Sequence, residues 1–128
     1  MRLLDTGPGN VWQLSEILNR STHVVVPVRM EPMTMQALGL FLPRLRAVQA
    51  CAGGRPALLG LIATHFVTRS TEHRSVLDQL GLFARQQGTE VLGVVPFTIG
   101  VGMRLSTRGH HYRPIAERVL GLVGAAAA

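Results

Sequence analysis

Three stretches of the chain are dense in valine, leucine and isoleucine, and each has a turn signal near its end. They are His23 to Val28, Ala57 to Thr64 and Glu90 to Pro96. Short apolar runs of this kind are typical of strands that are buried on both faces of a parallel sheet. A fourth, much shorter strand is expected at Leu3-Leu4, where the chain runs into the glycine- and proline-rich loop after Asp5.

Between these stretches, apolar residues recur at three- and four-residue spacing, which predicts amphipathic helices. The predicted helices cover Val11 to Asn19, Met33 to Ala50, Glu72 to Gln87 and Tyr112 to Val123. Strands that alternate with helices favour an α/β fold with a parallel sheet flanked by helices. We expect one domain over residues 1–124, and a disordered tail over residues 125–128.

The composition fits a folded domain. Hydrophobic residues make up 47% and charged residues 16% of the 128 residues, which excludes a disordered chain. No apolar run approaches the roughly 18 residues that a membrane-spanning helix requires, so we expect no membrane span and a cytoplasmic protein. Trp12 and the single cysteine, Cys51, are expected to be packing residues without a chemical role.

The positive charge of the chain indicates which classes of partner it can bind. All thirteen basic residues are arginines, and the formal net charge is +6. Such a chain favours polyanions, with nucleic acid first and an anionic membrane surface second, although an arginine-rich proteome yields basic chains whatever their function. The candidate contacts to DNA phosphates are Arg69, Arg74, Arg104, Arg108 and Arg113, and a solvated basic surface is the alternative for all of them.

Polar residues that close the apolar runs are the candidates for chemistry, because ligands of parallel α/β sheets bind outside the carboxyl ends of the strands. These residues are Asp5-Thr6, Arg29 to Glu31, Thr64-His65 and Pro96 to Thr98. An aspartate at a strand end before a glycine- and proline-rich loop can hold Mg²⁺ through water. Asp5 can equally cap the helix that begins near Asn10, or simply start a turn.

Four short motifs stand in the order and spacing of the second half of a known family. They are Leu3-Leu4-Asp5-Thr6-Gly7-Pro8-Gly9, Val25-Val26-Pro27-Val28-Arg29-Met30-Glu31-Pro32, Gly60-Leu61-Ile62-Ala63-Thr64 and Val94-Val95-Pro96. From Leu3 to about Val123, the chain resembles the C-terminal half of ParA/MinD-type partition ATPases. The resemblance implies a partial P-loop NTPase-like sheet flanked by helices, without the half that carries the phosphate-binding loop.

The resemblance also implies a switch. Asp5 is similar to the switch II aspartate at the end of the Walker B strand, and would bind Mg²⁺ through water if a P-loop half completed the site. Thr6, Pro8 and Gly9 are similar to the loop that senses the γ-phosphate.

The same resemblance implies a place for the adenine. Thr64 and the turn Pro96-Phe97 are similar to positions around the base, while Val67 stands where the family pattern has an aspartate.

ATP and Mg²⁺ are the cofactors implied for the family, but phosphoryl transfer there needs a glycine-rich loop with a lysine. This chain contains no such loop and no lysine, so we expect it alone neither to bind nor to hydrolyse ATP. The implied partners are non-specific DNA, a ParB-like adaptor and a second ParA-like chain, at the nucleoid. Two alternatives stay open: a non-catalytic DNA-binding or protein-interaction module on a decayed P-loop scaffold, and a fragment of a wrongly started reading frame.

The resemblance finally predicts a weak point in the sheet. In the similar folds, the strand before the phosphate loop lies between those that correspond to Leu3 to Asp5 and His23 to Val28. Unpaired buried amides cost about 1 to 3 kcal/mol each, so an open slot there is not sustainable. We therefore expect an ordered core from His23 to Pro96, a poorly held segment Met1 to Gly9, and self-association through the edge at His23 to Val28.

Overall fold

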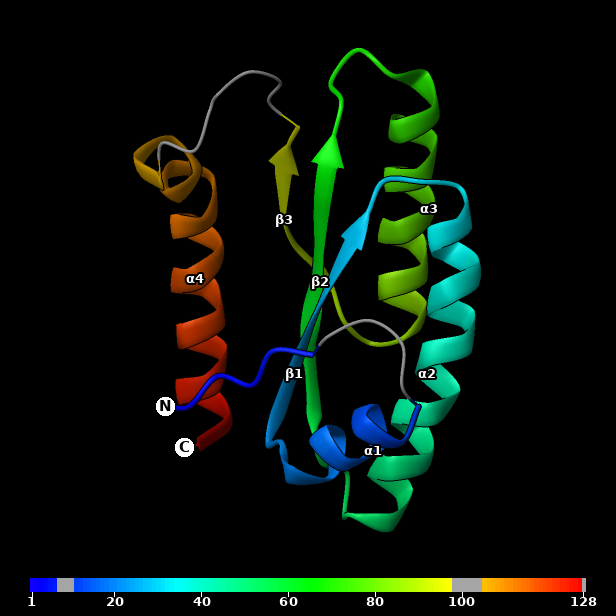
Figure 1. Ribbon diagram of the computed structural model, residues 1–128, viewed down its shortest axis with the longest axis vertical. Coiled ribbons are helices and arrows are strands. Elements are labelled where there is room, and N and C mark those ends of the chain that lie inside the picture. The colour runs from blue at the N-terminus through cyan, green and yellow to red at the C-terminus, as the bar shows by residue number, and fades with distance from the viewer. Residues whose placement is uncertain (7–10, 98–104, 128) are drawn as a thin grey trace.

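The computed structural model describes residues 1–6, 11–97 and 105–127, and in this part of the chain four helices alternate with three parallel strands (Figure 1). In chain order, the elements are α1 (Val11–Arg20), β1 (His23–Arg29), α2 (Met33–Cys51), β2 (Ala57–Phe66), α3 (Thr71–Gln86), β3 (Val91–Pro96) and α4 (Leu105–Ala127). The predicted α/β class with a parallel sheet flanked by helices is confirmed.

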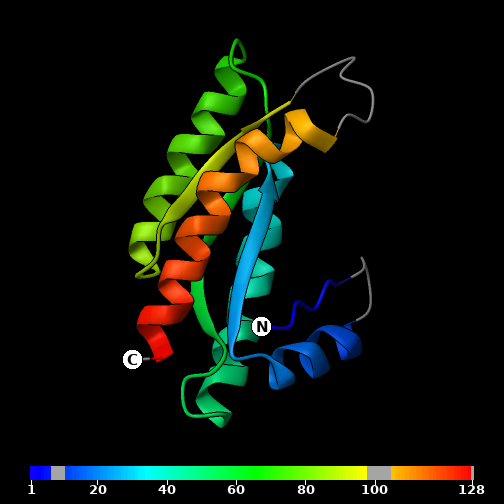
Figure 2. The same cartoon turned by 90° about the vertical axis from the view of Figure 1, so that its left-hand side faces the viewer.

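The sheet has the order β1-β2-β3, so β2 is the central strand. Its register pairs Arg29 of β1 with Thr64 of β2, and Phe66 of β2 with Pro96 of β3. Figures 1 and 2 show α2 and α3 on one face of the sheet and α4 on the other. The carboxyl ends of all three strands therefore lie at one edge, between the two helical layers.

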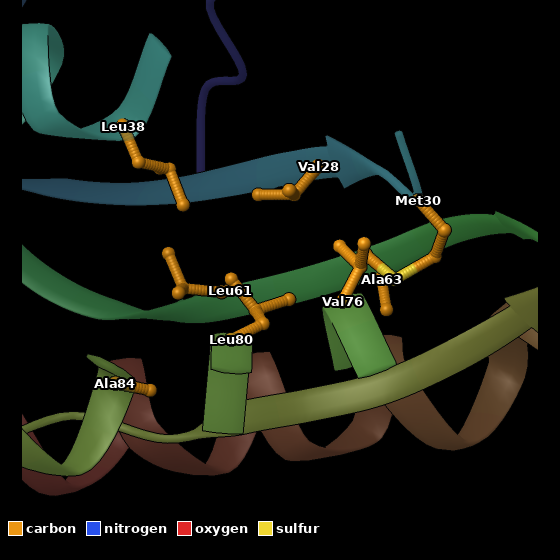
Figure 3. Packing of buried hydrophobic residues seen from close by; sticks show 8 residues of the cluster. All are labelled: Val28, Met30, Leu38, Leu61, Ala63, Val76, Leu80 and Ala84. Atoms are coloured by element: carbon orange, nitrogen blue, oxygen red, sulfur yellow. The ribbon is translucent and has the colours of Figure 1, made fainter. Parts of the chain in front are cut away.

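Two hydrophobic clusters explain why the strands read as continuous apolar runs. On the face covered by α2 and α3, Leu61 and Ala63 of β2 pack with buried residues of those helices (Figure 3). On the other face, Leu92 and Val95 of β3 pack with Ile115 of α4. Because the sheet is covered on both faces, successive residues of its strands are apolar rather than alternating.

Two glycines permit close packing around β3. A Cβ added to Gly93 would lie 2.4 Å from Cγ1 of Ile115, and one added to Gly60 would lie 2.5 Å from Cγ of Leu92. A side chain at Gly93 would therefore collide with α4, while one at Gly60 would collide with β3.

β1 is an edge strand with a proline in its middle. Met30 donates its N–H to the carbonyl of Thr64 across the β1–β2 pair, at 3.1 Å. Because backbone groups alternate in direction along a strand, the nitrogen of Pro27 faces away from β2, and it carries no hydrogen. The outer edge of β1 thus lacks one donor, which opposes the self-association expected there.

The short strand predicted at Leu3-Leu4 does not form, and this prediction was wrong. Residues 1–6 have no regular secondary structure, and the exposed fractions of Leu3 and Leu4 are 83% and 44%. Figure 2 shows the segment on the side of β1 that faces away from β2. Two apolar residues bury too little surface to hold a strand against an edge that lacks a donor.

Further differences concern the helices. α4 begins at Leu105 rather than at Tyr112, and it runs on to Ala127, through the alanines of the expected tail. Trp12 is 84% exposed and Cys51 is also exposed, so neither is a core residue. None of the described helices is long and apolar enough to cross a membrane.

Candidate functional site

The candidate site lies at the carboxyl-end edge of the sheet, where β1, β2 and β3 end at Arg29, Phe66 and Pro96. Of the residues singled out in the sequence, the structure brings Thr64, Pro96 and Phe97 to this edge. It does not bring Asp5 and Thr6 there, because both are exposed in the segment outside the sheet. Figures 1 and 2 place that segment level with the middle of β1.

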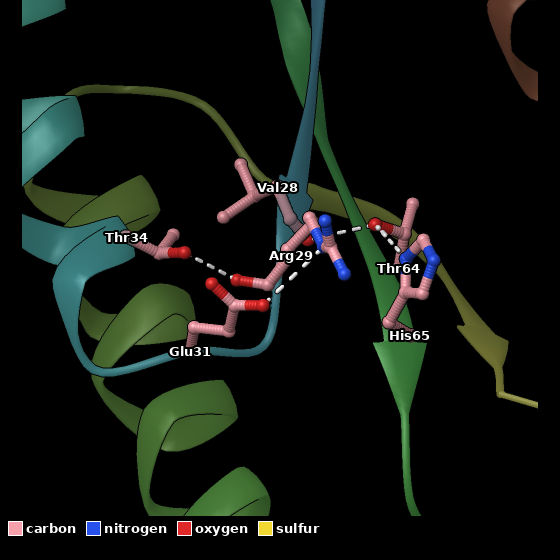
Figure 4. A network of polar contacts seen from close by, with 6 residues as sticks. All are labelled: Val28, Arg29, Glu31, Thr34, Thr64 and His65. Atoms are coloured by element: carbon pink, nitrogen blue, oxygen red, sulfur yellow. Dashed lines mark hydrogen bonds and ion pairs between the residues drawn. The ribbon is translucent and has the colours of Figure 1, made fainter.

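Thr64 connects the ends of β1 and β2, and its side chain is buried, with 8% of the residue exposed. The hydroxyl donates a hydrogen bond to the carbonyl of Val28, at 3.3 Å (Figure 4). Nδ1 of His65 lies 3.3 Å from the same hydroxyl. Since the single hydroxyl proton goes to Val28, the bond to His65 needs a proton on Nδ1, with Thr64 as the acceptor.

His65 has a left-handed backbone, with a φ of 56° that residues other than glycine seldom adopt. Its ring stacks on that of Phe97, with the centroids 5.7 Å apart and the planes 26° from parallel. The N–H of Phe97 donates to the carbonyl of Phe66 at 2.9 Å, which ties the end of β3 to that of β2. Strained conformations of this kind cluster at ligand-binding sites.

The turn after β1 is also closed by hydrogen bonds. The carbonyl of Arg29 accepts bonds from the backbone N–H of Glu31 and from the hydroxyl of Thr34. Nε of Arg29 lies 3.4 Å from Oε1 of Glu31, and both side chains are more than half exposed (Figure 4). An ion pair this exposed contributes little to stability, so Arg29 remains accessible to an anionic ligand.

The loop between β2 and α3 is held by His73. Val67 donates its N–H to Nδ1 of His73 at 2.9 Å, and the hydroxyl of Ser70 caps α3 by accepting from the N–H of His73 at 3.1 Å. Arg69 and Arg74 follow in this loop and in the first turn of α3. Both are exposed. The backbone N–H of Arg74 donates to the carbonyl of Ser70 at 3.2 Å, but neither guanidinium has a hydrogen-bond or ion-pair partner among the described residues.

The five candidate arginines do not form a single cluster in the part of the chain that the structure describes. Arg113 lies on α4, across the sheet from α3, and Nε of Arg113 is 3.8 Å from Oε1 of Glu117. Arg104 lies outside the described residues, and the side chain of Arg108 is not described. Arg69 and Arg74 therefore remain as the described pair of close, unpaired arginines.

The predicted switch lies partly outside the described residues. Pro8 and Gly9 lie outside the described residues. Among the residues that are described, no group of three or more histidines, cysteines, aspartates or glutamates is placed to hold a metal ion. Figures 1 and 2 place the segment of residues 1–6, which includes Asp5, level with the middle of β1 rather than at the carboxyl ends of the strands.

A shallow hollow of about 220 Å³ lies away from this edge, between α2 and α3. It is lined by Leu42, Pro43 and Phe83, with Arg46 and Gln87 beside them. The guanidinium of Arg46 donates to the carbonyl and the side-chain oxygen of Gln87, so its polar groups already have partners within the fold.

Comparison with known proteins found no protein-family model, no curated protein and no solved structure that matches the chain.

Proposed function

We propose that the chain acts in DNA partition as a ParA-type protein, and that its own part is to bind DNA without sequence preference rather than to hydrolyse ATP. The observation that carries this is the pair Arg69 and Arg74, exposed and unpaired beside the carboxyl end of a parallel α/β sheet. The order of the four sequence motifs supports the family. The parallel sheet between helical layers is compatible with the P-loop NTPase-like fold that the proposal includes.

Two observations oppose hydrolysis of ATP by this chain alone. Asp5 and Thr6, which the resemblance assigns to the switch, are exposed outside the sheet. The chain contains no lysine and no glycine-rich loop to neutralise the phosphates of ATP. ATP and Mg²⁺ would thus require a phosphate-binding half supplied by another segment or chain, and titration calorimetry of this chain with ATP and Mg²⁺ is expected to show no binding. Micromolar affinity would contradict this expectation.

DNA binding by arginines follows from counterion release. Each phosphate neutralised by an arginine adds about 0.9 to the slope of log affinity against log salt for duplex DNA. Phosphate contacts carry no base information, so the affinity should not depend on sequence. The net charge of +6 attracts the duplex over a longer range at low salt.

The test is fluorescence anisotropy with two duplexes of unrelated sequence over a series of salt concentrations. The double variant Arg69→Ala/Arg74→Ala should bind both more weakly and lower the salt slope by about 2. The matched control is Arg44→Ala/Arg55→Ala, which removes the same charge from two exposed arginines in α2 and in the turn before β2. An equal loss in the control, or a clear preference for one sequence, would refute the proposal.

The wider partition role adds partners. A ParB-like adaptor and a second ParA-like chain at the nucleoid of the cytoplasm belong to this proposal, and they rest on the sequence motifs alone. Co-purification of a ParB-like protein with this chain from its own cells is the measurement that checks them.

A second candidate function is a non-catalytic DNA-binding or protein-interaction module on a P-loop-like scaffold. It is favoured by the exposed position of Asp5 outside the sheet. The double variant Arg69→Ala/Arg74→Ala separates the two in cells that carry the gene: it should raise the loss rate of the partitioned DNA if the chain acts in partition, and leave that rate unchanged in a module with another role.

A further inference from the structure

The aromatic pair at the carboxyl-end edge presents an exposed ring. His65 stacks against Phe97, while 47% of Phe97 remains exposed. A single exposed apolar residue is common on protein surfaces and needs no explanation by itself. The ring of Phe97 differs from such a residue because hydrogen bonds fix both Phe97 and its stacking partner, His65.

Hydrogen bonds hold the pair in place from beneath. The N–H of Phe97 bonds to the carbonyl of Phe66, and Nδ1 of His65 bonds to the hydroxyl of Thr64, which itself bonds to the end of β1. A ring held this way loses little conformational entropy when a flat ligand stacks on it.

Three arginines lie on segments at the same edge of the sheet as this aromatic pair. Arg29 is the register partner of Thr64, the residue next to His65. Arg69 and Arg74 follow β2 in the loop above it and in the first turn of α3 (Figure 1). The edge thus combines an aromatic face with cations on neighbouring segments, which is the chemistry that binds unpaired bases and their phosphates.

We propose that this edge binds single-stranded nucleic acid, with one base stacked on the exposed part of Phe97 and the adjoining phosphates on Arg69 and Arg74. The inference rests on the proposed function in placing DNA phosphates on these two arginines, and deepens it by naming the strand state. A base within a duplex has both faces covered by its neighbours, so only an unpaired base has a face available for Phe97. A free nucleotide carries its phosphates on a single sugar, whereas a strand carries further phosphates at the nucleotides on either side of the stacked base.

The experiment measures binding of the full chain to a labelled oligothymidine of about 12 nucleotides, within the site sizes of single-strand binders. The same measurement uses an abasic strand of equal length, with identical phosphates and no bases, and a duplex. Phe97→Ala removes the ring, Phe97→Leu keeps apolar bulk and serves if the alanine variant fails to fold, and Tyr112→Ala removes a comparably exposed ring from α4.

Removal of the Phe97 ring should weaken oligothymidine binding by about 5- to 150-fold, the range found for base–aromatic stacking. The unmodified chain should bind the abasic strand more weakly than oligothymidine by the same factor. The Tyr112→Ala variant should bind oligothymidine as the unmodified chain does, and the Phe97 variants should bind the duplex with unchanged affinity. Equal affinity for the abasic strand, no effect of either Phe97 variant, an equal loss for the duplex, or displacement of the strand by micromolar ATP would each overturn the inference. If instead the proposed function is wrong, the affinity for the duplex will not change in the Arg69→Ala/Arg74→Ala variant.

Discussion

Replacement of Gly60 by alanine tests whether the close approach of β2 and β3 limits the stability of the sheet. The added Cβ would lie 2.5 Å from Cγ of Leu92 and 2.8 Å from the carbonyl oxygen of Glu90. Leu92 is 2% exposed, and the carbonyl of Glu90 accepts the N–H of Leu61 at 2.9 Å. The methyl group must therefore displace a packed side chain, or lengthen a hydrogen bond between the two strands.

The magnitude follows from three contributions. Overpacking costs about 1 to 3 kcal/mol. Weakening of the bond from Leu61 to Glu90 costs up to about 1 kcal/mol more. Restriction of the unfolded chain by alanine returns about 0.4 to 1 kcal/mol. With the midpoints of these ranges, the net loss is about 2 kcal/mol, which is a large share of the roughly 5 to 15 kcal/mol that stabilise a domain.

Urea unfolding, followed by circular dichroism, measures this loss. For an m-value of about 2 kcal/mol/M, the midpoint of Gly60→Ala should fall by about 0.5 to 1.5 M without a change of m. The matched control is Gly81→Ala in α3, where an added Cβ meets no atom within 4 Å. It should stabilise the chain by about 0.5 to 1 kcal/mol, because glycine is the poorer helix former. A Gly60→Ala protein at least as stable as the unmodified chain would refute the packing argument.

Three further substitutions are measured by the same urea assay. Leu80→Ala, at a fully buried position of α3, should cost about 2 to 5 kcal/mol, and a loss below that range would mean that the site collapses around the cavity. Ser70→Ala removes the cap on the N–H of His73 and should cost about 1 kcal/mol, whereas Ser70→Asp should restore most of it. Thr64→Val removes the bond to the carbonyl of Val28 and should cost about 0.5 to 1.5 kcal/mol, so an unchanged midpoint would show that this bond adds no net stability.

The strands and helices were largely predictable because their signals are local. β2 reads as an unbroken apolar run since Leu61 and Ala63 face α3 while Ile62 faces α4, and the predicted strand begins at the observed residue. The start of α4 was missed because residues 105–111 carry polar and glycine residues without a clear apolar period. Trp12 was misjudged for a different reason: it lies outside the four-residue spacing of Leu14 and Leu18, which face the core.

The candidate site was predictable only in part. Thr64 and Phe97 were found from their place at strand ends, because parallel strands bring those ends to one edge. The stacking of His65 on Phe97 depends on the register of β2 against β3 and on a positive φ at His65, and neither has a local signal. The separation of Arg113 from Arg69 and Arg74 likewise depends on which face of the sheet each helix covers. Charge in the sequence indicates a polyanionic partner but not where the charges gather.

Pro27 makes the open edge of the sheet selective about what can extend it. Two copies of this chain that met edge to edge would each bring the same missing donor, so a symmetric pair would lose two ladder bonds. A strand from a different protein would lose only one, and could place a residue that needs no partner opposite Pro27. Pro27 thus disfavours edge-to-edge pairing of two copies of this chain more than pairing with a strand of another protein.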